Sequence, residues 1–292
     1  MIEISILNWA KCNAINTSVV LSRHYLTLSI MLNSSINFQI VSDLHLEFGS
    51  GYESFDIPPS APYLCLLGDI GLAVDDKLFT FLESQLKVFK IVYFVLGNHE
   101  AYRSSYSFAK QRFATFQKSC QDRRATLGEF IVLDQTRYDI ENVTILGCTL
   151  YSNVTAEQHD HVSFGLNDFY MIENWSVEQH NDAHKSDVEW LCAQLKEIKK
   201  EPNRCIMVLT HHSPTLLEKA HDPRHRGSKL TSAFATDLLP ELDMSQVKVW
   251  AYGHTHFNHP SIMVGEVELI TNQRGYITDL SSNFDVSKVV TL

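Results

Sequence analysis

Short apolar runs that end in metal-ligating residue types are the feature that most constrains this chain. The first run, Phe38 to Val41, is followed at once by Asp43 and His45. Alternate residues of a strand point to the same side, so both side chains can leave the strand end together. A carboxylate and an imidazole placed in this way can bind one divalent metal ion.

The same arrangement recurs four times along the chain. Strand-like apolar runs at 63–67, 91–96, 204–210 and 247–252 are followed by Asp69, by Asn98 and His99, by His211 and His212, and by His254 and His256. Open α/β sheets bind their ligands at the carboxyl ends of strands. If these strands are neighbours, we expect the polar side chains to converge in one crevice.

The spacing of apolar residues predicts helices and further strands between these runs. Helices are expected over 75–90, 104–123, 186–200 and 233–239. Hairpin-type, antiparallel strands are expected at 130–133, 137–140 and 143–150. The first of these helices lies between two strand runs and forms a βαβ unit with them. Ser186 and Glu189 are predicted to form a capping box at the start of the helix over 186–200, and residues 151–177 are expected to form a long loop with short helical pieces.

Composition is typical of a globular protein. The chain has 292 residues, of which 45% are hydrophobic, and it contains no internal repeat or low-complexity linker. We therefore expect one domain at 36–292, preceded by an N-terminal extension at 1–35. The net charge is −10 and there is no basic block, which argues against a nucleic-acid scaffold.

The cysteines and the N-terminal residues bear on the compartment. Cys65, Cys148 and Cys205 lie in apolar runs and Cys192 is expected on the apolar face of a helix, without any Cys-x-x-Cys pair. This pattern is typical of reduced, buried thiols. The apolar stretch at 18–32 is short and carries charges, and the first residues lack the positive charge of a signal peptide. We expect a cytoplasmic protein without a membrane anchor.

The five motifs, in this order, resemble those of the calcineurin-like metallophosphoesterase superfamily. They are Asp-x-His, Gly-Asp, Gly-Asn-His-Glu, His-His and Gly-His-x-His, and the resemblance covers about residues 38 to 275. Thr-His-His-Ser-Pro and the late Asn272-Gln-Arg-Gly-Tyr276 are most similar to small soluble bacterial and fungal members. The resemblance implies an α/β fold, a four-layer αββα sandwich of two mixed β-sheets flanked by helices.

The resemblance also implies two divalent metal ions of the manganese, iron or zinc type. One ion would take Asp43, His45, Asp69 and His256, and the other would take Asp69, Asn98, His211 and His254. A bridging carboxylate, here Asp69, holds two such cations about 3.5–4 Å apart, where they polarise a phosphate and generate a hydroxide. His99 resembles the histidine that contacts the phosphate and protonates the leaving group.

Several residues near the motifs have alternative interpretations. Either His211 or His212 could be the ligand, and the register of the strand end favours His211; His212 would then lie behind the ligands or face the substrate. The basic residues at 224–226 are interpreted as a solvated loop rather than a phosphate site. Asn167 and Asp168, which recur in the resembled subgroup, are interpreted as structural.

The implied function is hydrolysis of a small phosphate mono- or diester, in which hydroxide attacks phosphorus and His99 donates a proton. The alternatives are a cyclic-nucleotide phosphodiesterase with the same ligands and a protein-binding scaffold without activity. Purple acid phosphatases have a tyrosine where this chain has Leu72, and protein Ser/Thr phosphatases have an arginine-containing extension that is missing at 68–74. The sequence therefore argues against both subclasses.

Overall fold

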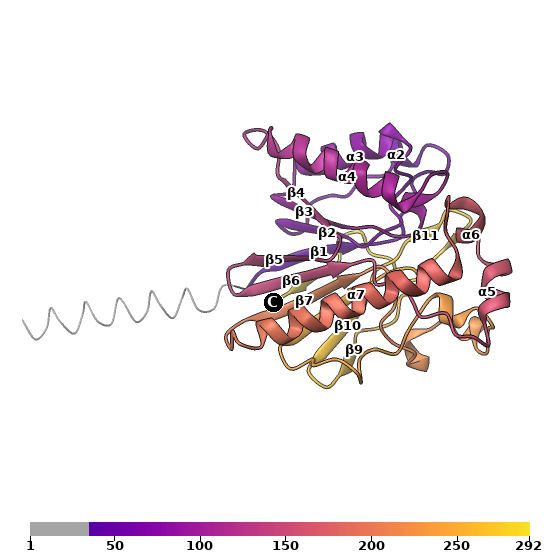
Figure 1. Ribbon diagram of the computed structural model, residues 1–292. Coiled ribbons are helices and arrows are strands. Elements are labelled where there is room, and N and C mark those ends of the chain that lie inside the picture. The colour runs from indigo at the N-terminus through magenta and orange to yellow at the C-terminus, as the bar shows by residue number, and fades with distance from the viewer. Residues whose placement is uncertain (1–34) are drawn as a thin grey trace, which may run out of the picture. The chain divides into compact units, whose positions relative to one another are not determined.

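Two β-sheets packed face to face form the centre of the computed structural model, which describes residues 35–292 (Figure 1). Residues 37–290 form one unit. The first sheet has the order β13-β1-β2-β3-β4, and the pairs from β1 to β4 are parallel. Its strands are β1 (Asn37–Val41), β2 (Tyr63–Leu66), β3 (Ile91–Val95), β4 (Glu129–Leu133) and β13 (Val289–Thr291).

The second sheet has the order β5-β6-β7-β8-β10-β9 and mixes parallel and antiparallel pairs. Its strands are β5 (Thr136–Ile140), β6 (Val143–Cys148), β7 (Cys205–Thr210), β8 (Val247–Tyr252), β9 (Ile262–Val264) and β10 (Val267–Thr271). The β5–β6 hairpin is antiparallel, as the sequence predicts. The neighbouring β4 was predicted to belong to the same antiparallel group, but it pairs in parallel with β3 in the first sheet.

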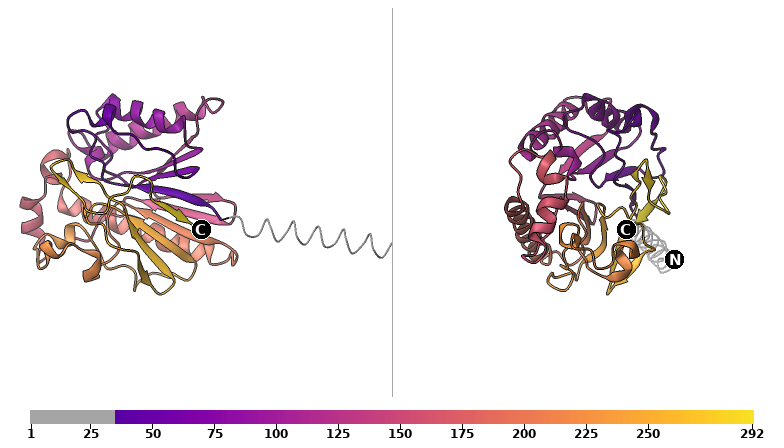
Figure 2. Two further views of the ribbon diagram at one scale, coloured as in Figure 1. Left: turned by 180° about the vertical axis from the view of Figure 1, so that it is seen from behind. Right: turned by 90° about the vertical axis from the view of Figure 1, so that its right-hand side faces the viewer.

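Helices cover the outer faces of both sheets and complete four layers (Figure 1, Figure 2). The long helices are α3 (Asp76–Leu86) and α4 (Tyr106–Gln121) on the first sheet and α7 (Val177–Ile198) on the second. Shorter pieces are α2 (Gly51–Ser54), α5 (His159–Gly165) and α6 (Asp168–Met171), and a small hairpin is formed by β11 (Gly275–Tyr276) and β12 (Asp279–Leu280). The predicted α/β sandwich of two sheets flanked by helices is confirmed.

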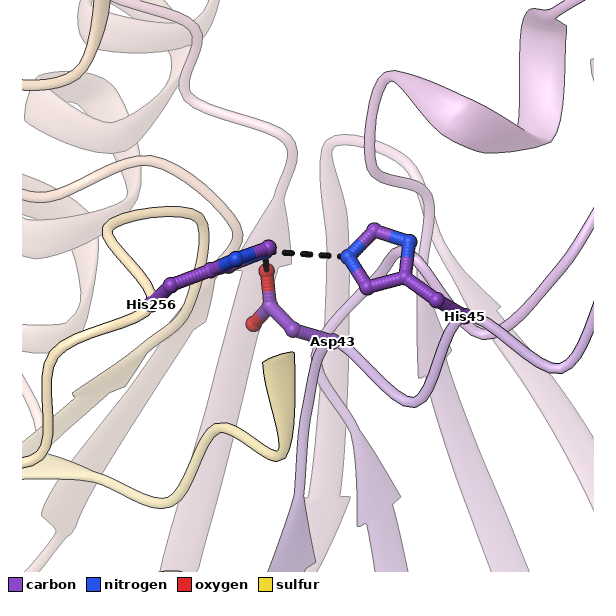
Figure 3. A group of neighbouring side chains, drawn as sticks. All are labelled: Asp43, His45 and His256. Carbon is purple, nitrogen blue, oxygen red and sulfur yellow. Dashed lines mark hydrogen bonds and ion pairs between the residues drawn. The ribbon is translucent and has the colours of Figure 1, made fainter. Parts of the chain in front are cut away.

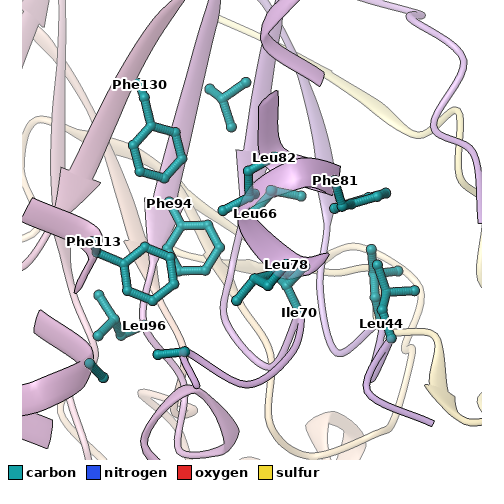
Figure 4. Packing of buried hydrophobic residues seen from close by; sticks show 14 of the residues in the cluster. Leu44, Leu66, Ile70, Leu78, Phe81, Leu82, Phe94, Leu96, Phe113 and Phe130 are labelled. Carbon is teal, nitrogen blue, oxygen red and sulfur yellow. The ribbon is translucent and has the colours of Figure 1, made fainter. Parts of the chain in front are cut away.

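Apolar side chains of α3 and α4 form the core on the first sheet (Figure 4). Leu78 and Leu82 lie one turn apart on α3 and are fully buried. Phe94 of β3 stacks on Phe113 of α4, with ring centroids 4.5 Å apart. Full burial of a side chain of this size stabilises the fold by about 1.5–3 kcal/mol. This packing holds β3 in place, and the residues after β3 include Asn98.

The helix predicted over 186–200 begins at Val177 instead. The Ser176 side chain caps its first turn by accepting a hydrogen bond from a backbone N–H group. His180 and His184 continue the buried stripe of the helix toward its start. Because histidine is polar, the stripe is not recognisable from apolar spacing alone, and the predicted start was wrong.

The prediction of a helix over 233–239 was also wrong. A 3₁₀ turn covers Thr231–Ala233, and the chain after it pairs with the loop that follows β7. The Thr236 backbone N–H donates to the Ser213 carbonyl at 3.1 Å, so these backbone groups bond across the chain rather than along a helix.

The cysteines follow the prediction only in part. Cys65 and Cys148 are buried, Cys205 is half-buried, and all are free thiols. Cys192 is exposed, so the prediction that it faces the core was wrong. It lies on the outer side of α7, next to the buried Leu191.

Within residues 35–292, the structure contains no helix with the length and apolar character that crossing a membrane requires. The predicted extension at 1–35, with its apolar stretch at 18–32, lies outside the described residues apart from residue 35.

Candidate metal centre

Seven candidate ligands gather where the carboxyl ends of five strands meet. Asp43 and His45 follow β1, Asp69 follows β2, Asn98 follows β3, His211 follows β7, and His254 and His256 follow β8. His256 is half-buried and the others are buried. Three groups of side chains have ligand atoms within 4.8 Å of one another, namely Asp43, His45 and His256; His45, Asp69 and His99; and Asp69, His211 and His254.

The first group contains two imidazoles that face each other (Figure 3). His45 Nε2 lies 2.9 Å from His256 Nε2, and Asp43 Oδ1 lies 3.3 Å from the same His256 nitrogen. Burial lowers the pKa of His45 to about 4, so its ring is neutral at physiological pH. His45 Nδ1 donates to Glu47 at 3.3 Å, which leaves the lone pair of Nε2 directed into the group. Such an arrangement fits a cation.

The group of Asp69, His211 and His254 is organised around His211. Its Nδ1 donates to the Leu67 carbonyl at 2.8 Å, so its Nε2 is an acceptor. The Nε2 atom lies 3.0 Å from Asn98 Oδ1 and 3.5 Å from Asp69 Oδ1. These neighbours are acceptors as well, and acceptor atoms that face one another in a buried site need a positive charge between them. The donor set therefore fits a second cation.

Asp168 fixes the orientation of the Asn98 amide. Asn98 Nδ2 donates to Asp168 Oδ1 at 2.9 Å, and the Tyr102 hydroxyl donates to the same oxygen at 2.7 Å. With its NH₂ group held there, the amide presents its oxygen to His211. The sequence interpretation of Asp168 as structural gave no indication of this direct contact with a candidate ligand.

His99 lies between a carboxylate and a phenol. Its Nδ1 donates to Glu47 at 2.8 Å, and its Nε2 lies 3.1 Å from the Tyr276 hydroxyl. Burial opposes ionisation of Glu47, but hydrogen bonds from His45 and His99 outweigh it and lower the pKa of Glu47 to about 2. Glu47 was not among the residues predicted from the sequence, although it follows His45 at the same spacing that separates His45 from Asp43.

The backbone at the site is strained. Five candidate ligands have left-handed backbones with φ between 48° and 68°, namely Asp43, His45, Asp69, His254 and His256. Each such non-glycine residue costs roughly 1–2 kcal/mol. Two of the glycines in the motifs are required by space, because a Cβ atom at Gly97 would overlap the Asp69 carboxylate and one at Gly253 would overlap Ser42 Oγ.

Glu100, the last residue of Gly-Asn-His-Glu, joins two of the ligand-bearing loops. Its buried carboxylate accepts hydrogen bonds from the backbone N–H groups of Asp69 at 3.0 Å, Ile70 at 2.8 Å and Gly97 at 2.7 Å. The loops after β2 and β3 are therefore held against each other from inside the protein.

His212 differs from His211 in its surroundings. It is fully buried, and neither ring nitrogen has a hydrogen-bond partner among residues 35–292. Its ring centroid lies 4.1 Å from that of His254 and 5.5 Å from that of His180. His212 lies behind the candidate ligands and does not line the cavity that opens beside them, which is described next.

A cavity of about 650 Å³ opens next to the candidate ligands. Asp69, Asn98, His99, His254 and His256 form its floor. Its other walls come from residues 165–168, from the loop at 222–234 and from the hairpin region at 276–282. A volume of this size suits a small organic ligand.

Known proteins resemble this chain over most of its length. Residues 36–258 match the family model of the calcineurin-like phosphoesterases. An uncharacterised protein of Acanthamoeba polyphaga mimivirus is 27% identical over 259 residues, which are 81% of this chain and 90% of the viral protein. The crystal structure of a phosphopantetheinyl hydrolase from Mycobacterium tuberculosis has a similar fold, with a TM-score of 0.61 and 16% identity over 83% of this chain and 90% of that one.

Proposed function

Because the chain belongs to the calcineurin-like phosphoesterase family, we propose that it hydrolyses small phosphate mono- or diesters with two divalent metal ions of the manganese, iron or zinc type. The convergence of carboxylate, amide and imidazole acceptors around Asp69 supports this proposal. Mixed nitrogen and oxygen ligands suit these metals. We further propose that residues 36–292 form the catalytic domain and that it acts in the cytoplasm.

The proposed ligands come from both sheets. One ion would be held by Asp43, His45, Asp69 and His256, and the other by Asp69, Asn98, His211 and His254. Asp69 belongs to two of the three groups of side chains, which supports its role as the bridge. When bound, two ions of this kind polarise a phosphate oxygen and lower the pKa of a water molecule.

His99 is the proposed proton donor. The Glu47 carboxylate accepts its Nδ1–H and stabilises the protonated ring, as a carboxylate does for a catalytic histidine elsewhere. Its Nε2 faces the cavity beside the Tyr276 hydroxyl. A proton on Nε2 can therefore be passed to the departing oxygen of an ester bound in the cavity.

The change His99→Asn tests this role. An alkoxide leaving group needs a proton and an aryl oxide does not, so kcat/KM should fall by roughly 10²–10⁴-fold for an alkyl phosphate and much less for a nitrophenyl phosphate. Metal content, measured by elemental analysis, should be unchanged. Equal losses for both esters at full metal content would refute the proton-donor role and leave the metal site standing.

Glu47→Gln should show the same dependence on the leaving group, since it removes the charge that stabilises the protonated ring. Glu53→Gln is the matched control, because Glu53 is exposed and its ion pair within residues 35–292 is with Lys77, away from the site. A panel of mono-, di- and cyclic phosphate esters tests the proposed reaction itself and separates it from a cyclic-nucleotide phosphodiesterase. A protein that binds two metal ions and hydrolyses none of these esters would contradict the proposed function.

A further inference from the structure

A second cavity adjoins the one at the candidate metal centre. Its volume is about 330 Å³, and it is formed by the segment from Leu216 to Phe234 together with Thr255. The two cavities share five wall residues, namely Asp222, His225, Leu230, Phe234 and Thr255. A molecule bound at the metal centre can therefore extend past this common wall into the second cavity.

Phe234 connects the common wall to the candidate ligands. Its ring stacks on His254, with centroids 4.8 Å apart and planes at 26°. The ring of Phe234 thus lies between the second cavity and the candidate metal centre. At this distance, the phosphate of an ester can lie at the metal centre while the organic group of the same ester lies in the second cavity.

The charged side chains that line the second cavity are paired. Glu218, Asp222 and Arg226 line it; Arg226 pairs with Glu218, and Asp222 pairs at 2.7 Å with Arg224, which lines the first cavity. Exposed ion pairs of this kind are weak, but within residues 35–292 the wall then carries no unpaired lysine or arginine that would attract a second anionic group. The basic residues noted in the sequence at 224 and 226 are thus balanced by neighbours that the linear motif does not include.

Apolar side chains provide most of the exposed wall of the second cavity. Leu216, Pro223, Leu230 and Phe234 line it beside His221 and His225, and Leu216 is 48% exposed to solvent although its side chain is large and apolar. An exposed leucine at the wall of such a cavity is available to bury against an apolar ligand.

We propose that the second cavity binds the organic group of the ester and selects substrates in which this group is uncharged and apolar, of about the size of two aromatic rings. The inference rests on the proposed hydrolysis of phosphate esters. It excludes a preference for esters that carry a second phosphate at this end.

The test compares phenyl phosphate with 4-biphenylyl phosphate, whose leaving phenols have similar acidity. In the wild-type protein loaded with Mn²⁺, kcat/KM for the biphenylyl ester should exceed that for the phenyl ester on the order of tenfold, as expected for one additional buried apolar group. Leu216→Glu should remove most of this preference, because it should lower kcat/KM for the biphenylyl ester far more than for phenyl phosphate, whose smaller ring reaches less of the cavity. Leu217→Glu is the matched control, because it adds the same charge one residue away. Leu217 is 37% exposed and does not line the cavity.

Binding of 4-phenylphenol, measured by calorimetry with and without metal, gives a readout that does not depend on turnover. The wild type and Leu217→Glu should bind it at least about tenfold more tightly than phenol, and Leu216→Glu should not. No preference for the larger ester or phenol in the wild type, or equal effects of the two substitutions, would overturn the proposal. If neither ester is hydrolysed, the proposed function fails, and the phenol measurements still decide whether the cavity binds an apolar group.

Discussion

Replacing Asp168 tests how the Asn98 ligand is oriented. Asp168 is 3% exposed, and its Oδ1 accepts from both Asn98 Nδ2 and the Tyr102 hydroxyl. In Asp168→Ala the Asn98 amide loses the shorter of the two hydrogen bonds that hold its NH₂ end and keeps only the 3.3 Å bond to the Tyr102 hydroxyl. It can then rotate and donate to His211 Nε2, which lies 3.0 Å from its present oxygen.

The size of the effect follows from this alternative hydrogen bond. A metal ion would have to break it and rotate the amide back, at a cost of about 0.5–1.5 kcal/mol for the hydrogen bond alone. Loss of orienting groups around metal ligands typically costs roughly 10–100-fold in affinity, or about 1.4–2.7 kcal/mol. We therefore expect Asp168→Ala to weaken binding of one of the two ions by about tenfold or more.

Asp168→Asn separates orientation from charge. Asparagine keeps a carbonyl oxygen that can accept from Asn98 and Tyr102 but has no negative charge. Calorimetric titration with Mn²⁺ should give nearly wild-type affinities for Asp168→Asn and weakened binding for Asp168→Ala. Asp160→Ala, at an exposed position of α5, serves as the control. Equal losses in the alanine and asparagine variants would refute the orientation argument and assign the effect to charge.

Three further predictions concern the metal site, the core and the domain boundary. Asp69→Ala should reduce bound metal from about two equivalents to one or fewer by elemental analysis, because it removes the proposed bridge. Phe113→Ala should lower the free energy of unfolding in urea by about 3–5 kcal/mol, since Phe113 is fully buried, whereas Phe108→Ala on the same helix should cost far less because Phe108 is 39% exposed. A chain that begins at Ile36 should bind the same amount of metal and unfold at the same urea concentration as the full chain, and a loss of either would place residues 1–35 within the catalytic domain.

The ends of strands could be predicted from the sequence because each apolar run stops at a polar residue. The run before Asp69 and the run before His211 become β2 and β7, and both residues reach the site from the strand ends expected. Strand identity and register were therefore enough to bring the candidate ligands together. The conformation of residues 233–239 could not be predicted in this way, because their backbone groups form hydrogen bonds with a segment that is distant in the sequence.

The residues that orient the candidate ligands were not predictable in this way. Asp168 meets Asn98 across 70 positions of sequence, and Tyr276 meets His99 across 177. Neither contact follows from a local pattern, since it depends on how a loop and a hairpin fold over the strand ends. Glu47 is closer in sequence, but its role depends on His99, which arrives from a different strand.

The backbone strain in the loops that carry the candidate ligands must be offset by favourable interactions elsewhere in the fold. Five left-handed residues at roughly 1–2 kcal/mol each cost an amount similar to the net stability of a typical domain, about 5–15 kcal/mol. Local hydrogen bonds offset part of this cost, such as those from the backbone N–H groups of Asp43 to the Gly68 carbonyl and of His45 to the Asp69 carbonyl, both 3.0 Å long. The remaining cost must be offset by apolar packing on the outer faces of the two sheets, away from the site. Ions that bind the folded chain and not the unfolded one would add stability at the place where the strain is greatest.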